Sequence, residues 1–153
     1  MPLVVLWAML PFLAQRHLTG LLALPGFARD SALYANLRLG AAVVAVVCLV
    51  QTIRCWIRMG SDWRMEVSRD NTNLITDGLF SRIRHPIYAF SVLLMLCSAL
   101  ILPSWPLLAV AAVHVVLMNI KARNEERHLM QSHGDAYARY LARTGRFFPR
   151  LGR

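Results

Sequence analysis

Residues 87–120 contain no Asp, Glu, Lys or Arg, and this long uncharged stretch restricts the folds open to this chain. As one α-helix, its 34 residues would extend about 50 Å, whereas the hydrocarbon core of a bilayer is about 30 Å thick. Pro103 and Pro106 lie near its middle, and two prolines so close together break a helix. The stretch therefore predicts a hairpin of two apolar helices, 87–102 and 107–120.

Both predicted helices are short, because a membrane span needs about 20 residues. Either the bilayer is thinner around them, or the second helix continues into water as an amphipathic extension. The polar residues 121–132, which permit a helix as far as Gly134, favour the extension.

Two further apolar segments precede the hairpin, at about residues 2–24 and 37–57. Pro11 would kink the first segment and Arg16 interrupts it, so a shorter span followed by an interfacial piece is an open alternative. The first segment lacks a basic start and an A-x-A-like cleavage site, so we expect a retained helix. A turn at residues 25–30 separates the two.

Composition favours lipid over a soluble core. Hydrophobic residues make up 57% of the chain and charged residues 16%, against roughly 25% charged in ordinary soluble domains. A globule of 153 residues cannot bury so much apolar helix on every face, whereas lipid can surround it. The expected fold is an all-α, polytopic transmembrane bundle of about four spans, with a proline-broken C-terminal hairpin and an amphipathic tail.

The positive charge predicts the orientation. Of the 17 Lys and Arg residues, 14 lie in residues 54–84 and 121–153, which flank the hairpin and so share one side of the membrane. The positive-inside rule makes that side cytoplasmic, and with four spans the N-terminus is cytoplasmic too. Topology and attraction to anionic lipid account for most of these arginines. Nucleic-acid binders are charge-rich, so no nucleic-acid partner is expected.

The acidic residues point to the same side, because seven of the eight lie in these two flanking segments. The closing hairpin brings the segments together, which predicts a site at the cytoplasmic boundary. In the first segment, Pro86 holds His85 in an extended conformation and suits the first turn of a helix. Arg84, His85 and that helix start suit a carboxylate ligand, with Tyr88 able to stack one turn further on. An interfacial anchor is the alternative.

The second segment contains Glu125 and Glu126, whose side chains point about 100° apart on a helix. A carboxylate at the membrane edge requires a cation. Two alternatives are open: an internal ion pair with Arg84 or Arg127, or a cationic ligand held by Glu125. The aromatic tail at residues 137–149 would close over a cofactor or lie on the headgroups.

Several motifs are absent from the sequence. Cys48, Cys55 and Cys97 have no metal-ligand spacing, so no metal is expected. No glycine-rich nucleotide motif, P-loop or nucleophile-elbow motif occurs, which argues against a soluble Rossmann methyltransferase.

The ordered motifs resemble a known family. Residues 84–88 (R-H-P-I-Y), an apolar hairpin, Glu125-Glu126, Gly134 and Tyr137 resemble the membrane methyltransferases related to isoprenylcysteine carboxyl methyltransferase and the phospholipid methyltransferases. The likeness covers about residues 59–149, and residues 59–64 resemble the M-G-x-x-W-R stretch of short bacterial members. It implies a multi-pass protein of a bacterial inner membrane, with residues 1–58 as N-terminal helices and 59–153 as the catalytic core.

The resemblance also implies S-adenosylmethionine as methyl donor and a lipophilic or lipid-linked acceptor. Carried over by position, catalytic roles fall on Arg84, His85 and Lys121. The cofactor-binding positions are Thr72, Asn73, Leu74, Ile75, Phe80, His85, Pro86, Ile87, Tyr88 and Glu125. The family often has Tyr at position 80, and its prenylcysteine enzymes have Arg at position 121, where this chain has Phe80 and Lys121.

The acceptor stays open between a carboxylate, an amine and a thiol. A carboxylate needs no base, whereas an amine or thiol would need one, for which His85 or His128 is the candidate. A non-catalytic membrane module and a nicotinamide-dependent reductase are the competing interpretations.

Overall fold

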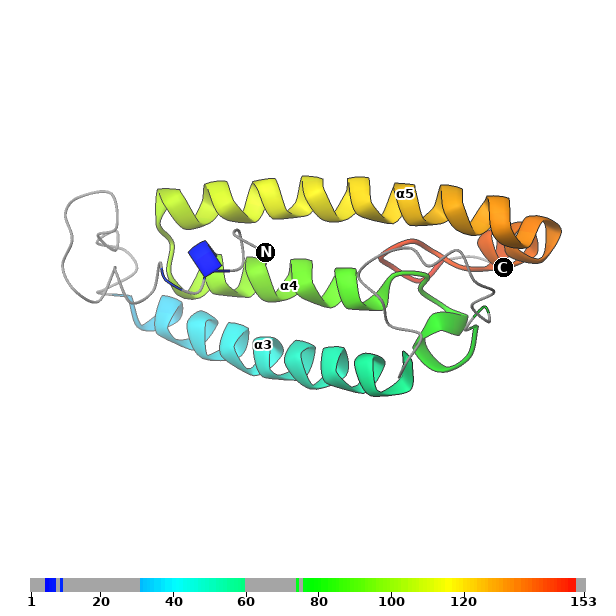
Figure 1. Cartoon of the computed structure of the whole chain (residues 1–153). Helices are drawn as coiled ribbons and strands as arrows, with labels where there is room; N and C mark the ends of the chain where they lie inside the picture. The colour runs from blue at the N-terminus through cyan, green and yellow to red at the C-terminus, as the bar shows by residue number, and fades with distance from the viewer. Residues whose placement is uncertain (1–4, 8, 10–30, 60–73, 75, 151–153) are drawn as a thin grey trace. The chain divides into compact units, whose positions relative to one another are not determined.

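The computed structural model describes residues 5–7, 9, 31–59, 74 and 76–150. Its elements are α3 (Ala32–Met59), the 3-10 turn η2 (Gly78–Ser81), α4 (Pro86–Ile101) and α5 (Trp105–Arg143) (Figure 1). Within these ranges there is no strand, and Ile83 and Gly145 form one isolated parallel bridge. The predicted all-helical fold is confirmed.

Helix α3 contains the predicted span at residues 37–57. It starts after Ser31, whose hydroxyl accepts a hydrogen bond from the Tyr34 amide at 3.3 Å. Its valines are exposed around the helix, for example Val43 at 58% and Val46 at 61%. An apolar helix with such exposure needs lipid as its solvent.

The proline-broken hairpin is confirmed. Helix α4 ends at Ile101 and α5 begins at Trp105 (Figure 1). Pro106 lies in the first turn of α5, where a missing N–H leaves no bond unmade. Met95 and Ala99 from α4 pack in one cluster with Leu107, Val110 and Ala111 from α5.

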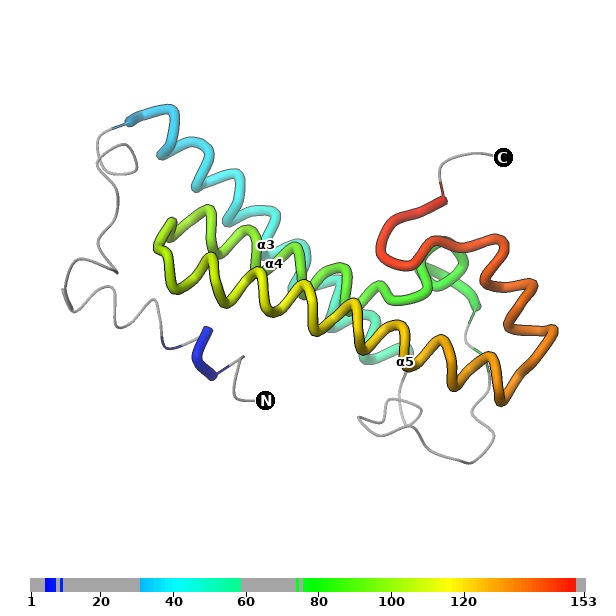
Figure 2. The backbone as a smooth tube through the Cα atoms, turned by 90° about the horizontal axis from the view of Figure 1, so that it is seen from above, coloured from blue at the N-terminus to red at the C-terminus, as the bar shows by residue number. Residues whose placement is uncertain are grey.

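Helix α5 continues beyond the apolar residues, as the extension predicted at 121–132 requires. It kinks at Gly134, whose φ of 47° is rarely adopted by residues with a side chain. After the kink the chain turns back, seen as the bend from orange to red in Figure 2.

The number of spans is only partly established. Two helices, α3 and α5, are long and apolar enough to cross a membrane, and α4 is a shorter apolar helix. The span predicted at residues 2–24 lies almost wholly outside the described residues, so the total of four stays a prediction.

The chain divides into two compact units, each built from separated segments. One consists of residues 1–49 and 92–117 and contains the hairpin core. The other consists of residues 50–91 and 118–153, so all the site residues described below belong to it.

Candidate functional site

The backbone of the residues before α4 forms hydrogen bonds with the C-terminal segment. These bonds fix the conformation of the chain at the point where α4 begins. The Arg84 amide donates to the Gly145 carbonyl at 2.8 Å, and the His85 amide donates to the Arg146 carbonyl at 3.1 Å. The Gly145 amide donates back to the Arg82 carbonyl at 3.0 Å. Figure 2 shows the two stretches side by side. The extended conformation predicted for His85 thus has backbone partners.

Gly145 is required by close packing within the C-terminal segment. A Cβ at this position would lie 1.7 Å from the Phe148 carbonyl oxygen, a distance that no side chain tolerates. The residues after Gly145 can fold back onto it because glycine has no side chain.

Glu126 forms the centre of an ion cluster with Arg84 and Arg146, which we call the Glu126 cluster. Its Oε1 accepts from Arg84 Nε at 3.0 Å and from Arg146 Nε at 3.1 Å, and its Oε2 accepts from Arg146 Nη2 at 2.5 Å. Arg84 and Glu126 have side chains only 10% exposed. Burial at this level strengthens the ion pairs but makes an unpaired member costly.

The arginines of this cluster have further acceptors. Arg84 Nη1 donates to the carbonyls of Leu141 and Thr144, and Arg146 Nη1 donates to Asn119 Oδ1 at 3.1 Å. Of the two alternatives for the glutamates, the internal ion pair with Arg84 is realised at Glu126. The cluster ties the start of α4 to α5 and to the C-terminal segment.

Glu125 has a different environment, which it shares with His85, Tyr88 and Lys121. The Tyr88 hydroxyl donates to Glu125 Oε1, and His85 Nδ1 lies 3.3 Å from Glu125 Oε2. Lys121 Nζ lies 5.5 Å from the centre of the Tyr88 ring. The Glu125 side chain is 32% exposed, so it keeps access to a ligand. The predicted neighbourhood of His85 and Glu125 is present, and we call it the Glu125 face.

His85 lies between the two glutamates and is buried. Its ring stacks on Tyr88 at 5.5 Å, and Phe147 meets it edge-on at 6.4 Å. Its Nε2 is 3.5 Å from Glu126 Oε1, without an aligned hydrogen bond to any described residue. Burial lowers the pKa of His85, but its interactions with the carboxylates of Glu125 and Glu126 outweigh this effect, so the pKa is raised. The two carboxylates therefore stabilise the charged form of His85 against the effect of burial.

Of the other predicted cofactor-binding positions, some lie within the described residues and some lie outside them. Phe80 is buried in η2, and its carbonyl accepts a hydrogen bond from the Tyr140 hydroxyl at 2.7 Å. Pro86 is buried, whereas Ile87 and Leu74 are partly exposed. Thr72, Asn73 and Ile75 lie outside the described residues, so their assignment stays a prediction.

Sequence reasoning missed Arg146, Asn119 and Thr144, which complete the Glu126 cluster. In the sequence, Arg146 is one of many basic residues near the C-terminus and carries no distinguishing spacing. The only local signal is the preceding Gly145, which marks a close backbone approach.

A family comparison decides the class of protein. The family model described as phospholipid methyltransferase matches residues 35–136, well over half of the chain. The chain belongs to this family. The match includes Arg84, His85, Tyr88 and both glutamates, and together with the apolar helices it identifies a membrane-associated member of a methyltransferase family.

Two curated relatives are similar over part of their length. The cobalt-zinc-cadmium resistance protein CzcN of Cupriavidus metallidurans is 35% identical over 54% of this chain and 38% of its own. The nickel-cobalt-cadmium resistance protein NccN of Alcaligenes xylosoxydans xylosoxydans is 32% identical over 54% of this chain and 39% of its own. The matched region thus spans about two fifths of each relative.

Proposed function

We propose that this member of the family transfers a methyl group from S-adenosylmethionine to a lipophilic acceptor at the cytoplasmic boundary of a membrane. Family membership supports methyl transfer, and the identity of the donor is our inference. The observation that carries it is Glu125, a partly exposed carboxylate held in place by Tyr88 and His85.

The residues of the Glu125 face fit the charges of this donor, which bears an ammonium, a carboxylate and a sulfonium. Glu125 would bind the ammonium, while Lys121 and the free N–H groups at the start of α4 would bind the carboxylate. Tyr88 offers a ring face for stacking. When bound, the donor would supply an electrophilic methyl group.

Arg84 takes a different role in this proposal from the catalytic one expected from the sequence. Its guanidinium already contacts Glu126, Leu141 and Thr144, so binding a substrate carboxylate would break buried contacts. We assign it to positioning: it fixes the backbone that presents His85 and the start of α4.

The surroundings of His85 bear on the choice of acceptor. Its ring is buried and its Nδ1 already lies 3.3 Å from Glu125 Oε2, so His85 is poorly placed to take a proton from an acceptor. This favours an acceptor that needs no deprotonation by His85. An amine or thiol acceptor would require another base, such as the partly buried His128.

The location and partners complete the proposal. The basic segments at residues 54–84 and 121–153 support a cytoplasmic site, with both termini cytoplasmic in a multi-pass protein of a bacterial inner membrane. The expected partners are membrane lipids and a lipophilic or lipid-linked acceptor. The names of the two relatives refer to metal resistance. Among the described residues, no group of three or more His, Cys, Asp or Glu side chains could hold a metal ion, and we propose no metal.

Isothermal titration of the purified chain with S-adenosylhomocysteine tests the donor. Wild type should bind, and Glu125→Gln should raise the Kd at least about tenfold, because a charged hydrogen bond contributes about 1.5–3 kcal/mol. Asp135→Asn is the matched control, since Asp135 is an exposed carboxylate on the same helix. Absence of wild-type binding at millimolar ligand, or equal affinity of Glu125→Gln, would contradict the proposal. Incubation with radiolabelled donor and membrane extract would then identify the acceptor.

A further inference from the structure

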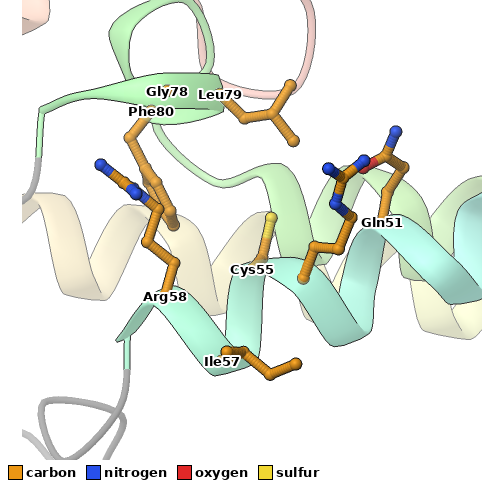
Figure 3. A pocket seen from close by; sticks show the side chains of 8 residues that line it. Gln51, Cys55, Ile57, Arg58, Gly78, Leu79 and Phe80 are labelled. Carbon is orange, nitrogen blue, oxygen red and sulfur yellow. The ribbon is translucent and has the colours of Figure 1, made fainter.

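A groove of about 810 Å³ lies between the last turns of α3 and the η2 turn, within one compact unit. Figure 3 shows Cys55 and Arg58 rising from α3 towards the turn, while the Phe80 ring extends down towards the helix. The groove is distinct in its lining from the Glu125 face, since His85, Tyr88, Lys121 and Glu125 are not among its residues.

The charges in this groove are positive. Arg54 and Arg58 line it, four residues apart and therefore on one side of α3. No acidic residue is among the described residues that line it. Arg54 is exposed and forms no hydrogen bond or ion pair with any part of the chain that the structure describes. Within the described residues, Arg54 is therefore a cation with no counter-charge at the edge of this groove.

Arg58 is held in place by a residue just outside the groove. Its Nε donates to Asp77 Oδ1 at 3.1 Å, and its Nη2 donates to Asp77 Oδ2. Hydrogen bonding to Arg58 lowers the pKa of Asp77, so the carboxylate stays charged near neutral pH. The pair orients Arg58, and in the part of the chain that the structure describes Nη1 has no acceptor.

The remaining lining is mostly apolar, although the Gln51 amide and Gly78 also contribute to it. Leu79 and Phe80 contribute from the turn, and Cys55 and Ile57 contribute from α3. A ligand that satisfies both parts of this groove carries a negative group for the arginines and an apolar body for the wall. The groove also lies at the end of α3, a helix apolar enough to span a membrane.

We propose that this groove binds an anionic phospholipid, with its phosphate at Arg54 and Arg58 and its glycerol and upper acyl chain against Leu79 and Phe80. Arginine suits a phosphate because its planar guanidinium can donate two parallel hydrogen bonds. A zwitterionic lipid would bring an ammonium towards two arginines, so charge complementarity selects acidic headgroups. The proposal does not require that the lipid be a substrate, and the groove shares Phe80 with the cofactor-binding positions that the family resemblance implies.

Native mass spectrometry of the purified full chain, titrated with phosphatidylglycerol and separately with phosphatidylcholine, tests this site. Phosphatidylglycerol should bind more tightly, and Arg54→Gln should raise its apparent Kd about tenfold, as expected for loss of one charged hydrogen bond. Arg139→Gln is the matched control, because Arg139 is also exposed but lies on α5. Leu79→Asn should weaken the lipid without affecting sn-glycerol 1-phosphate, which lacks acyl chains.

Four outcomes of these lipid titrations would overturn the proposal. They are equal binding of the two lipids, no change in Arg54→Gln, an equal loss in Arg139→Gln, and binding of sn-glycerol 1-phosphate as tight as that of the lipid. Helical content by circular dichroism verifies that each variant folds. Titration with S-adenosylhomocysteine separates this proposal from the methyl-donor proposal, because Arg54→Gln should leave that affinity unchanged. Displacement of phosphatidylglycerol by S-adenosylhomocysteine would assign the groove to the donor and also overturn the lipid site.

Discussion

Replacing Glu126 with Gln removes the negative charge at the centre of the Glu126 cluster and almost nothing else. The amide has nearly the same size as the carboxylate, so packing is preserved while the charge balance of two arginines changes. One amide oxygen can still accept a hydrogen bond, but the amide nitrogen would face a guanidinium as a donor facing a donor.

The cost follows from the burial of the two arginines. Arg84 has a side chain 10% exposed and, among the described residues, would keep the carbonyls of Leu141 and Thr144 and the Thr144 hydroxyl as full acceptors. Arg146 is 31% exposed and can recover part of its hydration. Breaking a buried ion pair on one side costs about 3–5 kcal/mol. Since one arginine is partly hydrated, we expect about 3 kcal/mol for Glu126→Gln.

Unfolding of the purified chain in bicelles, followed by circular dichroism against increasing sodium dodecyl sulfate, measures this loss. Glu125→Gln is the internal comparison, because Glu125 is the adjacent residue on the same helix but is 32% exposed. Glu126→Gln should lower stability by at least about 1.5 kcal/mol more than Glu125→Gln does. Equal losses in the two variants, or no loss in Glu126→Gln, would refute the assignment of the buried cluster to stability.

Three further predictions concern the chain around this cluster. Gly145→Ala should destabilise the fold by about 1–3 kcal/mol in the same assay, because its Cβ would overlap the Phe148 carbonyl. The raised pKa of His85 means that its contribution to stability is complete below its unfolded pKa of about 6.5 and is lost as pH rises through the folded value. Melting temperatures of wild type should therefore fall across that range, and those of His85→Gln should not show this component. Asp77→Asn should change stability little and weaken phosphatidylglycerol binding, because the exposed pair mainly orients Arg58; a large loss of stability would contradict this.

Much of the fold follows from where charges and prolines fall. The uncharged residues 87–120 and the break at Pro103–Pro106 predict the hairpin. Both limits of α4 and the start of α5 lie within a few residues of the prediction, whereas α5 continues past the kink at Gly134 to Arg143. The sequence also predicts the extension of α5 up to Gly134, because the polar residues after position 120 permit a helix without a break. These features depend on local chemistry, so the sequence alone is informative.

The roles of the two glutamates do not follow from the sequence. Helical geometry requires only that the side chains of Glu125 and Glu126 point about 100° apart. It does not determine which of the two is buried and which is exposed. The choice is made by Arg146, which reaches Glu126 from a segment 20 residues further along the chain. That contact depends on the fold of the C-terminal segment around Gly145, and no periodic pattern encodes it.

The division of roles between the glutamates bears on which ligand can enter. Glu126 is already surrounded by donors, so an incoming group meets the two charges of the Glu125 face that remain accessible, Glu125 and the exposed Lys121. A ligand with a single charge would pair with one of these two side chains. It would remove water from the other side chain without neutralising its charge, which is costly near a membrane. A ligand that carries an ammonium and a carboxylate on the same small framework compensates both. The amino-acid end of S-adenosylmethionine has this arrangement, and His85 maintains it by keeping Glu125 charged from its buried side.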